Sequence, residues 1–437
     1  MTQQYVEHYR KFSENGGGEA PDWVRSLRGN ALDRFVRLGF PTTRNEDWHF
    51  TSVAPIAGHD FTLLTSPSGD VRRATLEQFA FGGASDSWQT AVFVNGRFAP
   101  ELSRLGDLPS GVRILPLARA WSEAPDIARQ IGTVASSADA SFSALNTAFM
   151  YDGAVVHIAA NATLADPIHL LYVADRHAAN GVWHPRNMIV IDRNAKATVV
   201  ESYVALNDVT YFTNAVTEVV LGDGANLSHY KLQREALKAY HVGTIEVKQA
   251  KDSHYQSFSF AVGGSLARQN VGTLLDGPGC GATLNGLYML DGEQHCDHQT
   301  RIEHAQPNCF SREVYKGILD GASHGVFTGK VYVRPEAQKT DGKQTNNTLL
   351  LSERAQVDAK PQLEIFADDV KCTHGATVGR LDEMALFYMK SRGLGAESAR
   401  RLLTYAFAAE VLETIETDAV RDGLETATLA RYAVAGE

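Results

Sequence analysis

The residues of this chain best suited to chemistry are a cysteine and a histidine two positions apart, Cys372 and His374. They lie in the segment 368–379 (DDVKCTHGATVG), which has the composition of a strand. On a strand, residues i and i+2 point to the same face, about 6.5 Å apart along the chain. A thiolate beside an imidazole suits iron or an iron-sulfur cluster, provided that other groups complete the coordination shell. The spacing alone fits equally well a small buried thiol beside a hydrogen-bonded histidine.

A second polar cluster spans residues 295–304 (HCDHQTRIEH). If this segment is a strand, Cys296 and His298 face one way, whereas His295 and Asp297 face the other. A closed metal shell would require this segment to fold into a turn. We therefore expect these side chains to line up with polar residues of neighbouring strands or to lie on the surface. The alternative that stays open is a mononuclear metalloenzyme with the ligands His295, His298 and His304.

Other enzyme signatures are weak or missing. The segment 325–331 (GVFTGKV) is only faintly similar to a phosphate loop, because a Walker A motif needs glycine at 324 and Ser or Thr at 331, where His324 and Val331 stand. We expect this segment to form a strand and the chain itself to bind no ATP. A polysaccharide-active β-helix enzyme remains an alternative that would use carboxylates such as Asp368 and Asp369, although neighbours on a strand point apart.

Composition narrows the class of protein. The chain has 437 residues, a net charge of -10 and four cysteines without a Cys-x-x-Cys spacing. Such a chain can bury a large core without disulfides. The first residues lack the pattern of a signal peptide, and no apolar run approaches the ~20 residues of a membrane span. We therefore expect a soluble cytoplasmic protein with neither nucleic acid nor membrane as a partner.

The elements that must position these residues fall into three regions: 1–150, helical or mixed; 151–380, a β core; and 381–437, helical. Apolar residues recur at helical intervals over 20–40, where Gly39 ends the pattern. From about 155 to 378, short β-branched and aromatic runs are separated by Asp-Gly turns, the first at 223. Strands this numerous without helices between them predict a sandwich, a barrel or a solenoid.

The C-terminal region contains two predicted helices. Asp382 is a plausible cap for a helix that ends near residue 391, and glycines at 393 and 395 separate it from a helix over 396–416. Apolar residues almost encircle the second helix, which indicates either complete burial or one face for the fold and another for a partner. The candidate partner-binding residues are Leu402, Tyr405, Phe407 and Leu412.

Several motifs occur in the order and at the intervals of a known family. They are 339–342 (KTDG), 344–347 (QTNN), 360–365 (KPQLEI), 368–379 and 405–410 (YAFAAE). Together they closely resemble the SufB/SufD family of the Suf machinery for iron-sulfur cluster assembly, and CTHGATVG favours its SufD branch over the SufB paralogue. The resemblance is strong over about 311–413, looser over 154–308, and limited near the N-terminus to 41–48.

The resemblance implies a right-handed parallel β-helix flanked by helical regions, acting as a non-catalytic scaffold. It implies two partners: SufB, which pairs with the β-helix edge, and the ATPase SufC, which binds the C-terminal helices. His374 matches the family's histidine at the SufB interface, where a transient iron-sulfur cluster forms, and Cys372 matches its neighbouring cysteine. Since the site is shared, the chain alone should bind a cluster poorly. The resemblance leaves open whether a flavin joins the complex and whether two copies of the chain pair when SufB is absent.

Overall fold

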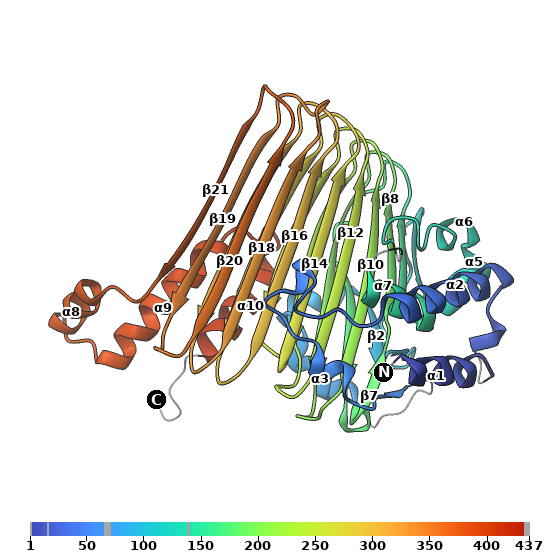
Figure 1. Ribbon diagram of the computed structural model, residues 1–437, viewed down its shortest axis with the longest axis horizontal. Coiled ribbons are helices and arrows are strands. Elements are labelled where there is room, and N and C mark those ends of the chain that lie inside the picture. Colours follow the sequence, from blue (N-terminus) through green and yellow to red (C-terminus); the bar gives the residue numbers. More distant parts are fainter. Residues whose placement is uncertain (1, 15–16, 65–70, 137, 139, 432–437) are drawn as a thin grey trace.

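The computed structural model describes residues 2–14, 17–64, 71–136, 138 and 140–431. Two long sheets of mostly parallel strands face each other and run the length of the molecule (Figure 1). The 11-stranded sheet contains, in spatial order, β20 (Gln356–Ile365), β18 (His324–Val333), β16 (His295–His304), β14 (Leu266–Leu275), β12 (Tyr240–Gln249), β10 (Phe212–Leu221), β8 (Arg186–Ile191), β5 (Ala154–Ile158) and β4 (Val112–Pro116). In addition, β7 (Gly181–Trp183) pairs with β10, and β1 (Thr62–Leu63) pairs with β7. The 10-stranded sheet contains β21 (Lys371–Gly379), β19 (Asp341–Leu350), β17 (Phe310–Leu319), β15 (Gly281–Leu290), β13 (His254–Ala261), β11 (Asn226–Arg234), β9 (Lys196–Ala205), β6 (Ile168–Ala174), β2 (Gln89–Val94) and β3 (Arg97–Phe98).

Successive strands from β8 to β21 alternate between the two sheets, so each coil adds one strand to each sheet in register with the previous coil. This is a parallel β-helix, and the predicted fold class is confirmed. Side chains of alternate residues point into the lumen and form a continuous apolar core that includes Val219, Val247 and Leu275. The phosphate-loop-like segment lies within strand β18, as expected from its sequence.

A ladder of turns fixes the stacking of the coils. Asn194, Gly224, Asp252, Gly279 and Asn308 occupy corresponding turns and all have positive φ, which Asn, Asp and Gly adopt most readily. Their backbone N–H groups each donate to a carbonyl in the next coil, for example at 2.8 Å from Gly224 and 2.9 Å from Asp252. The turn residues therefore satisfy backbone groups that would otherwise be left without a partner at the corner.

Helices flank the two ends of the β-helix. At the N-terminal end they are α1 (Gln3–Glu14), α2 (Asp22–Leu38), α3 (Ala54–Ala57), α4 (Arg73–Leu76), α5 (Leu117–Glu123), α6 (Pro125–Ala128) and α7 (Ser141–Phe149), with 3-10 turns η1 (Gly17–Glu19), η2 (Glu46–Trp48), η3 (Glu77–Phe79) and η4 (Gly82–Ser87); η5 (Arg176–Ala178) follows β6. The C-terminal helices are α8 (Glu383–Ser391), α9 (Ala396–Leu412) and α10 (Asp418–Arg431), the last of which reaches back to contact η4. Helices α9 and α10 pack on the outer face of the 10-stranded sheet, whereas α8 projects away from the body (Figure 1).

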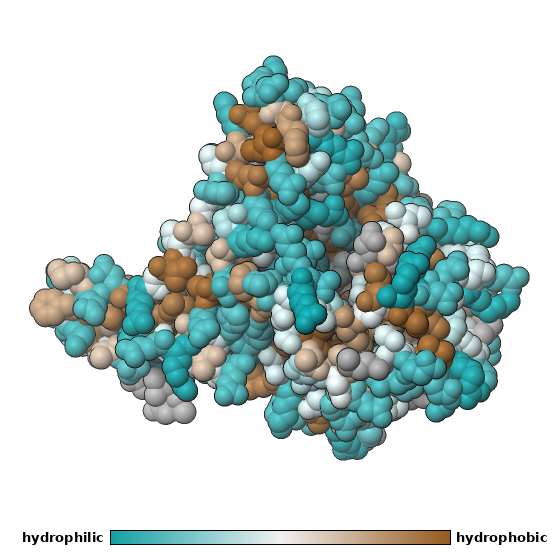
Figure 2. Space-filling model, in the orientation of Figure 1, coloured by the Kyte–Doolittle hydropathy of each residue, from teal (hydrophilic) through white to brown (hydrophobic). Residues whose placement is uncertain are grey.

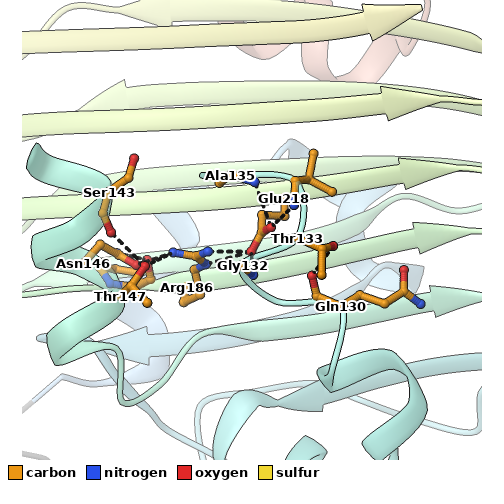
Figure 3. A network of polar contacts seen from close by, with 11 residues as sticks. Gln130, Gly132, Thr133, Ala135, Ser143, Asn146, Thr147, Arg186 and Glu218 are labelled. Atoms are coloured by element: carbon orange, nitrogen blue, oxygen red, sulfur yellow. Dashed lines mark hydrogen bonds and ion pairs between the residues drawn. The ribbon is translucent and has the colours of Figure 1, made fainter. Parts of the chain in front are cut away.

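A fully buried ion pair joins the N-terminal region to the β-helix (Figure 3). The Arg186 guanidinium on β8 lies 2.5 Å from the Glu218 carboxylate on β10. The carboxylate also accepts three backbone hydrogen bonds of 2.7 to 2.9 Å from segment 132–135. The guanidinium donates in turn to Asn146 and Thr147 on α7. Each guanidinium nitrogen and each carboxylate oxygen of the pair therefore has a hydrogen-bond partner, which a buried ion pair needs to offset its desolvation.

The two ends of the β-helix differ. At the N-terminal end, β4 pairs antiparallel with β5 and β3 pairs antiparallel with β2, and helices cover the neighbouring core. At the C-terminal end, β20 and β21 are the last strands of their sheets, and no strand in the described ranges pairs with their outer edges. One end is therefore covered by the chain's own elements, and the other presents two open edges.

Candidate functional site

The open end carries two edge strands whose free backbone groups can be identified from the hydrogen-bond pattern. Lys371 N–H donates to the Thr340 carbonyl at 2.8 Å, so the odd-numbered residues of β21 face β19. The N–H and C=O groups of Cys372, His374 and alternate residues beyond them consequently point outward. The side chains of these same residues face the lumen, where each one continues a row of side chains that stack from coil to coil.

Cys372 and His374 lie on one face of β21, as the i, i+2 spacing predicts. They are in register with Gly342 and Gln344 of β19, both of which face the lumen. Cys372 is half-buried beside the apolar residues Val331 and Val333, and burial raises the pKa of its thiol. His374 is exposed at the open end. The structure brings the two predicted site residues together at the edge; their coordination of a cluster stays a prediction.

The lumen directly beneath His374 is polar. Gln344 and Glu313 of β17 occupy the same lumen-facing row, one and two coils below the histidine. Gln344 Nε2 donates to Glu313 Oε2 at 2.5 Å, and burial raises the pKa of Glu313 to about 7. Glu313 Oε1 and Gln344 Oε1 are buried and have no hydrogen-bond partner within the described part of the chain. From its sequence, the polar run 344–348 suits stacked coils whose polar side chains line up from one coil to the next, but no role beside His374 was predicted for it.

The second predicted cluster is divided between the two faces of β16. Cys296 and His298 are buried inside, with Sγ and Nδ1 3.7 Å apart, and burial lowers the pKa of His298 to about 4. His295 and Asp297 point outward and bind Thr51 of the N-terminal region at 2.9 and 2.5 Å. The expected separation is confirmed, and the outer pair has an anchoring role that the sequence did not indicate.

The divided cluster offers no support to a mononuclear metalloenzyme. Nowhere in the described ranges do three or more His, Cys, Asp or Glu side chains converge in an arrangement that could hold a metal ion. His304, the third proposed ligand, instead makes a 2.9 Å hydrogen bond from Nε2 to Ser311.

A groove of about 520 Å³ lies between segment 41–48 and the outer face of the 11-stranded sheet. Trp48 and Glu246 are among its lining residues, but the Glu246 carboxylate is ion-paired with Arg301 at 3.0 Å. The carboxylates named for sugar cleavage, Asp368 and Asp369, are elsewhere, in the turn before β21. A pair of free carboxylates across a groove, which glycoside cleavage needs, is therefore not provided by these residues.

The predicted partner-binding residues on α9 have different environments. Leu402 is 49% exposed and Tyr405 is partly exposed. Phe407 is partly buried beneath the Lys316 ammonium, 4.4 Å from its ring centroid. Leu412 is completely buried in the core between α9 and the 10-stranded sheet, so it offers no surface to a partner in this structure.

Helix α8 exposes more apolar surface than α9. Met384, Phe387 and Tyr388 are 75%, 69% and 59% exposed, and apolar residues gather at this end of the molecule (Figure 2). Asp382 caps the helix, as predicted, by accepting the Met384 N–H at 2.8 Å. Sequence reasoning found the helix but missed its exposure, because a short helix with apolar residues is ordinarily buried.

Comparison with known proteins agrees with the fold. Residues 173–407 match the model for the SUF system FeS cluster assembly SufBD core domain, and residues 1–170 match that for the SufBD protein N-terminal region. The chain is 35% identical to the iron-sulfur cluster assembly protein SufD of Escherichia coli, over 92% of this chain and 90% of that protein. It is 35% identical to an iron-sulfur cluster assembly SufBD family protein of Synechocystis, over 89% and 86%. It is 30% identical to the chloroplastic protein ABCI7 of Arabidopsis thaliana, over 91% and 84%. In the part of the chain that the structure describes, no helix has the length and apolar character needed to cross a bilayer.

Proposed function

The chain belongs to the SufBD family of iron-sulfur cluster assembly proteins, and from that premise we propose that it is a non-catalytic scaffold subunit that shares a nascent cluster site with SufB. The observation that carries the proposal is the position of His374 on β21, whose outer edge pairs with no strand in the described ranges, at the open end of the β-helix. An edge strand offers a row of backbone donors and acceptors that a second β-helix can pair with in a defined register. Ile365, Phe366 and Val378 expose apolar surface at the same end, which suits a surface that becomes covered.

In this arrangement His374 supplies one ligand to the cluster, which is the cargo of the complex, and SufB supplies others. Cys372 is half-buried and burial raises the pKa of its thiol, so the sulfur would have to release a proton before it could bind iron. The division of ligands between two chains makes cluster assembly depend on pairing.

Blocking the edge tests the pairing. We call the contact between β21 and the partner β-helix the seam. Val378 is 53% exposed on the lumen-facing side of β21, so Val378→Lys should leave the isolated chain folded but place an unpaired ammonium in the seam once SufB has bound. We expect capture of SufB from a co-expression lysate to fall at least about tenfold, equivalent to about 1.4 kcal/mol. The matched control is Thr373→Lys, an exposed position on the opposite face of the same strand, which should capture SufB normally. Equal capture by both variants would remove the seam from the proposal.

We further propose that SufC docks on the apolar surface of α8 and the exposed part of α9, formed by Met384, Phe387, Tyr388 and Leu402. Helix α9 joins this surface to the core behind β15 and β17, so movement of SufC on binding ATP could be transmitted to the β-helix. The Lys316 ammonium, which binds the Phe407 carbonyl at 2.9 Å and pairs with Glu410, fastens α9 to β17. For SufC to switch the seam between two conformations, it must bind one of these conformations more tightly than the other.

The docking surface predicts a selective effect of polar substitutions. The double variant Met384→Gln/Phe387→Gln should weaken SufC binding at least about tenfold in calorimetry or pull-down, since exposed aromatic anchors dominate such contacts. Leu429→Gln on α10 is the matched control, because Leu429 is also about half exposed, at 50%. If the double variant and the control bind SufC equally, the docking surface lies elsewhere.

A further inference from the structure

The last complete coil beneath the open end contains buried polar atoms without partners. Gln344 and Asn346 of β19 face the lumen and are 2% and 1% exposed. Gln344 Oε1 and Asn346 Oδ1 accept no hydrogen bond from any residue that the structure describes. A buried acceptor without a donor costs about 1 to 3 kcal/mol, so two of them on the same strand of one coil call for an explanation.

The orientation of the Gln344 amide follows from its neighbour. Glu313, directly below in the same row, is hydrogen-bonded to Gln344 Nε2 at 2.5 Å. With Nε2 directed toward Glu313, the oxygen is the atom left to interact with the coil above. Gly329 on the facing sheet allows this arrangement, because a side chain there would overlap the Gln344 amide nitrogen.

The coil above Gln344 provides one strong donor. The lumen-facing residues of β21 are Cys372, His374, Ala376 and Val378, and His374 is the one in register with Gln344. Neighbouring strands lie about 4.8 Å apart, which places the imidazole within hydrogen-bond reach of Gln344 Oε1 after a change of side-chain rotamer. Ala and Val have no side-chain donor, and a thiol is a weak one.

We propose that Gln344 is a positioning residue for His374: in the assembled complex its Oε1 accepts the imidazole N–H on the side away from the cluster. This inference rests on the proposed function and assigns a role to the motif 344–347. Histidines that bind metals usually donate their second N–H to a carbonyl or carboxylate, which fixes the tautomer and ring orientation. Here the row His374, Gln344, Glu313 places a carboxyl group behind the amide, so the hydrogen bonds can reinforce one another.

Two variants of the complex purified with SufB and SufC test the proposal. Gln344→Met keeps the side-chain length but removes the acceptor, and it should increase the rate at which an iron chelator removes cluster iron about 10- to 100-fold. The double variant Gln344→Glu/Glu313→Gln exchanges donor and acceptor: the new amide at 313 donates to one carboxylate oxygen at 344, and the other oxygen still faces His374. This variant should return the chelation rate to within about threefold of wild type.

The electron paramagnetic resonance spectrum of the reduced cluster is a readout that a packing defect alone would not move. In Gln344→Met, the spectrum of the clusters that remain bound should differ from that of wild type. In the double variant, it should return toward the wild-type spectrum. His374→Ala serves as the reference. If His374→Ala loses the cluster while Gln344→Met keeps both the wild-type chelation rate and spectrum, the positioning role is wrong and the proposed function stands. If His374→Ala retains the cluster like wild type, the proposed function itself fails. A double variant as defective as Gln344→Met would also overturn the positioning role, since it would show that the acceptor is not what matters.

Discussion

Replacing His374 by alanine is expected to reduce the cluster retained by the co-expressed complex at least about tenfold, because removal of a ligand should cost no less than loss of a hydrogen bond that orients a ligand. The substitution is otherwise mild: His374 is exposed on an edge strand, so the chain should fold and still pair with SufB. Iron and acid-labile sulfide per complex, measured after anaerobic purification, provide the readout.

Cys372→Ala is the informative companion to His374→Ala. Its side chain is half-buried among apolar residues, and burial raises the pKa of its thiol. We expect a smaller loss than for the histidine, since alanine preserves much of the packing and the half-buried thiol must release its proton before it can bind iron. An intact complex of His374→Ala with wild-type cluster content would contradict the assigned ligand role. A larger loss for Cys372→Ala would transfer that role to the cysteine.

The second large effect is expected at the buried ion pair between the N-terminal region and the β-helix. Arg186→Met leaves the Glu218 carboxylate buried without its cation, and Glu218→Gln leaves the guanidinium buried without its anion. Removal of one member of such a pair typically costs about 3 to 5 kcal/mol. We therefore expect either variant to lower the free energy of unfolding by about this amount, measured by urea denaturation.

An exposed ion pair provides the control for the buried one. Arg119 and Glu123 are 2.7 Å apart on α5 and are both exposed, so Glu123→Gln should change stability by less than about 1 kcal/mol. The double variant Arg186→Met/Glu218→Met should be less destabilised than the sum of the two single changes, because neither charge is then left alone. Single variants as stable as the control would show that the pair does not hold the N-terminal region in place.

Local patterns in the sequence predicted many elements correctly. The β-branched and aromatic runs predicted between 155 and 378 are strands of the β-helix, the helix over 20–40 is α2, and the Asp382 cap begins α8. The Asp-Gly turns predicted from the sequence lie between strands, as at 223. These signals depend on neighbours along the chain: side-chain alternation, helical period, cap geometry and positive φ.

Other features had no such local signal. Helix α10 and the strands β2 to β4 were not predicted individually, and the strands lie in a region read as helical or mixed. Leu412 and Phe387 both have the composition of core residues, yet one is buried and the other is largely exposed. Gln344 and Glu313 are far apart in sequence and meet because their coils stack. Exposure and stacking depend on contacts between distant segments, which periodicity does not specify.

By itself the sequence determined that Cys372 and His374 share one face of a strand, since a strand repeats every two residues whatever surrounds it. Its motifs also indicated the family. The tertiary structure decided that this strand is the last of its sheet, that its free backbone groups and its imidazole lie at the same open end, and that an amide and a carboxyl group lie beneath them. The physical reason is that a coil is completed only by the coil next to it: where the stack ends, backbone groups and lumen side chains lose the partners that every earlier coil provides.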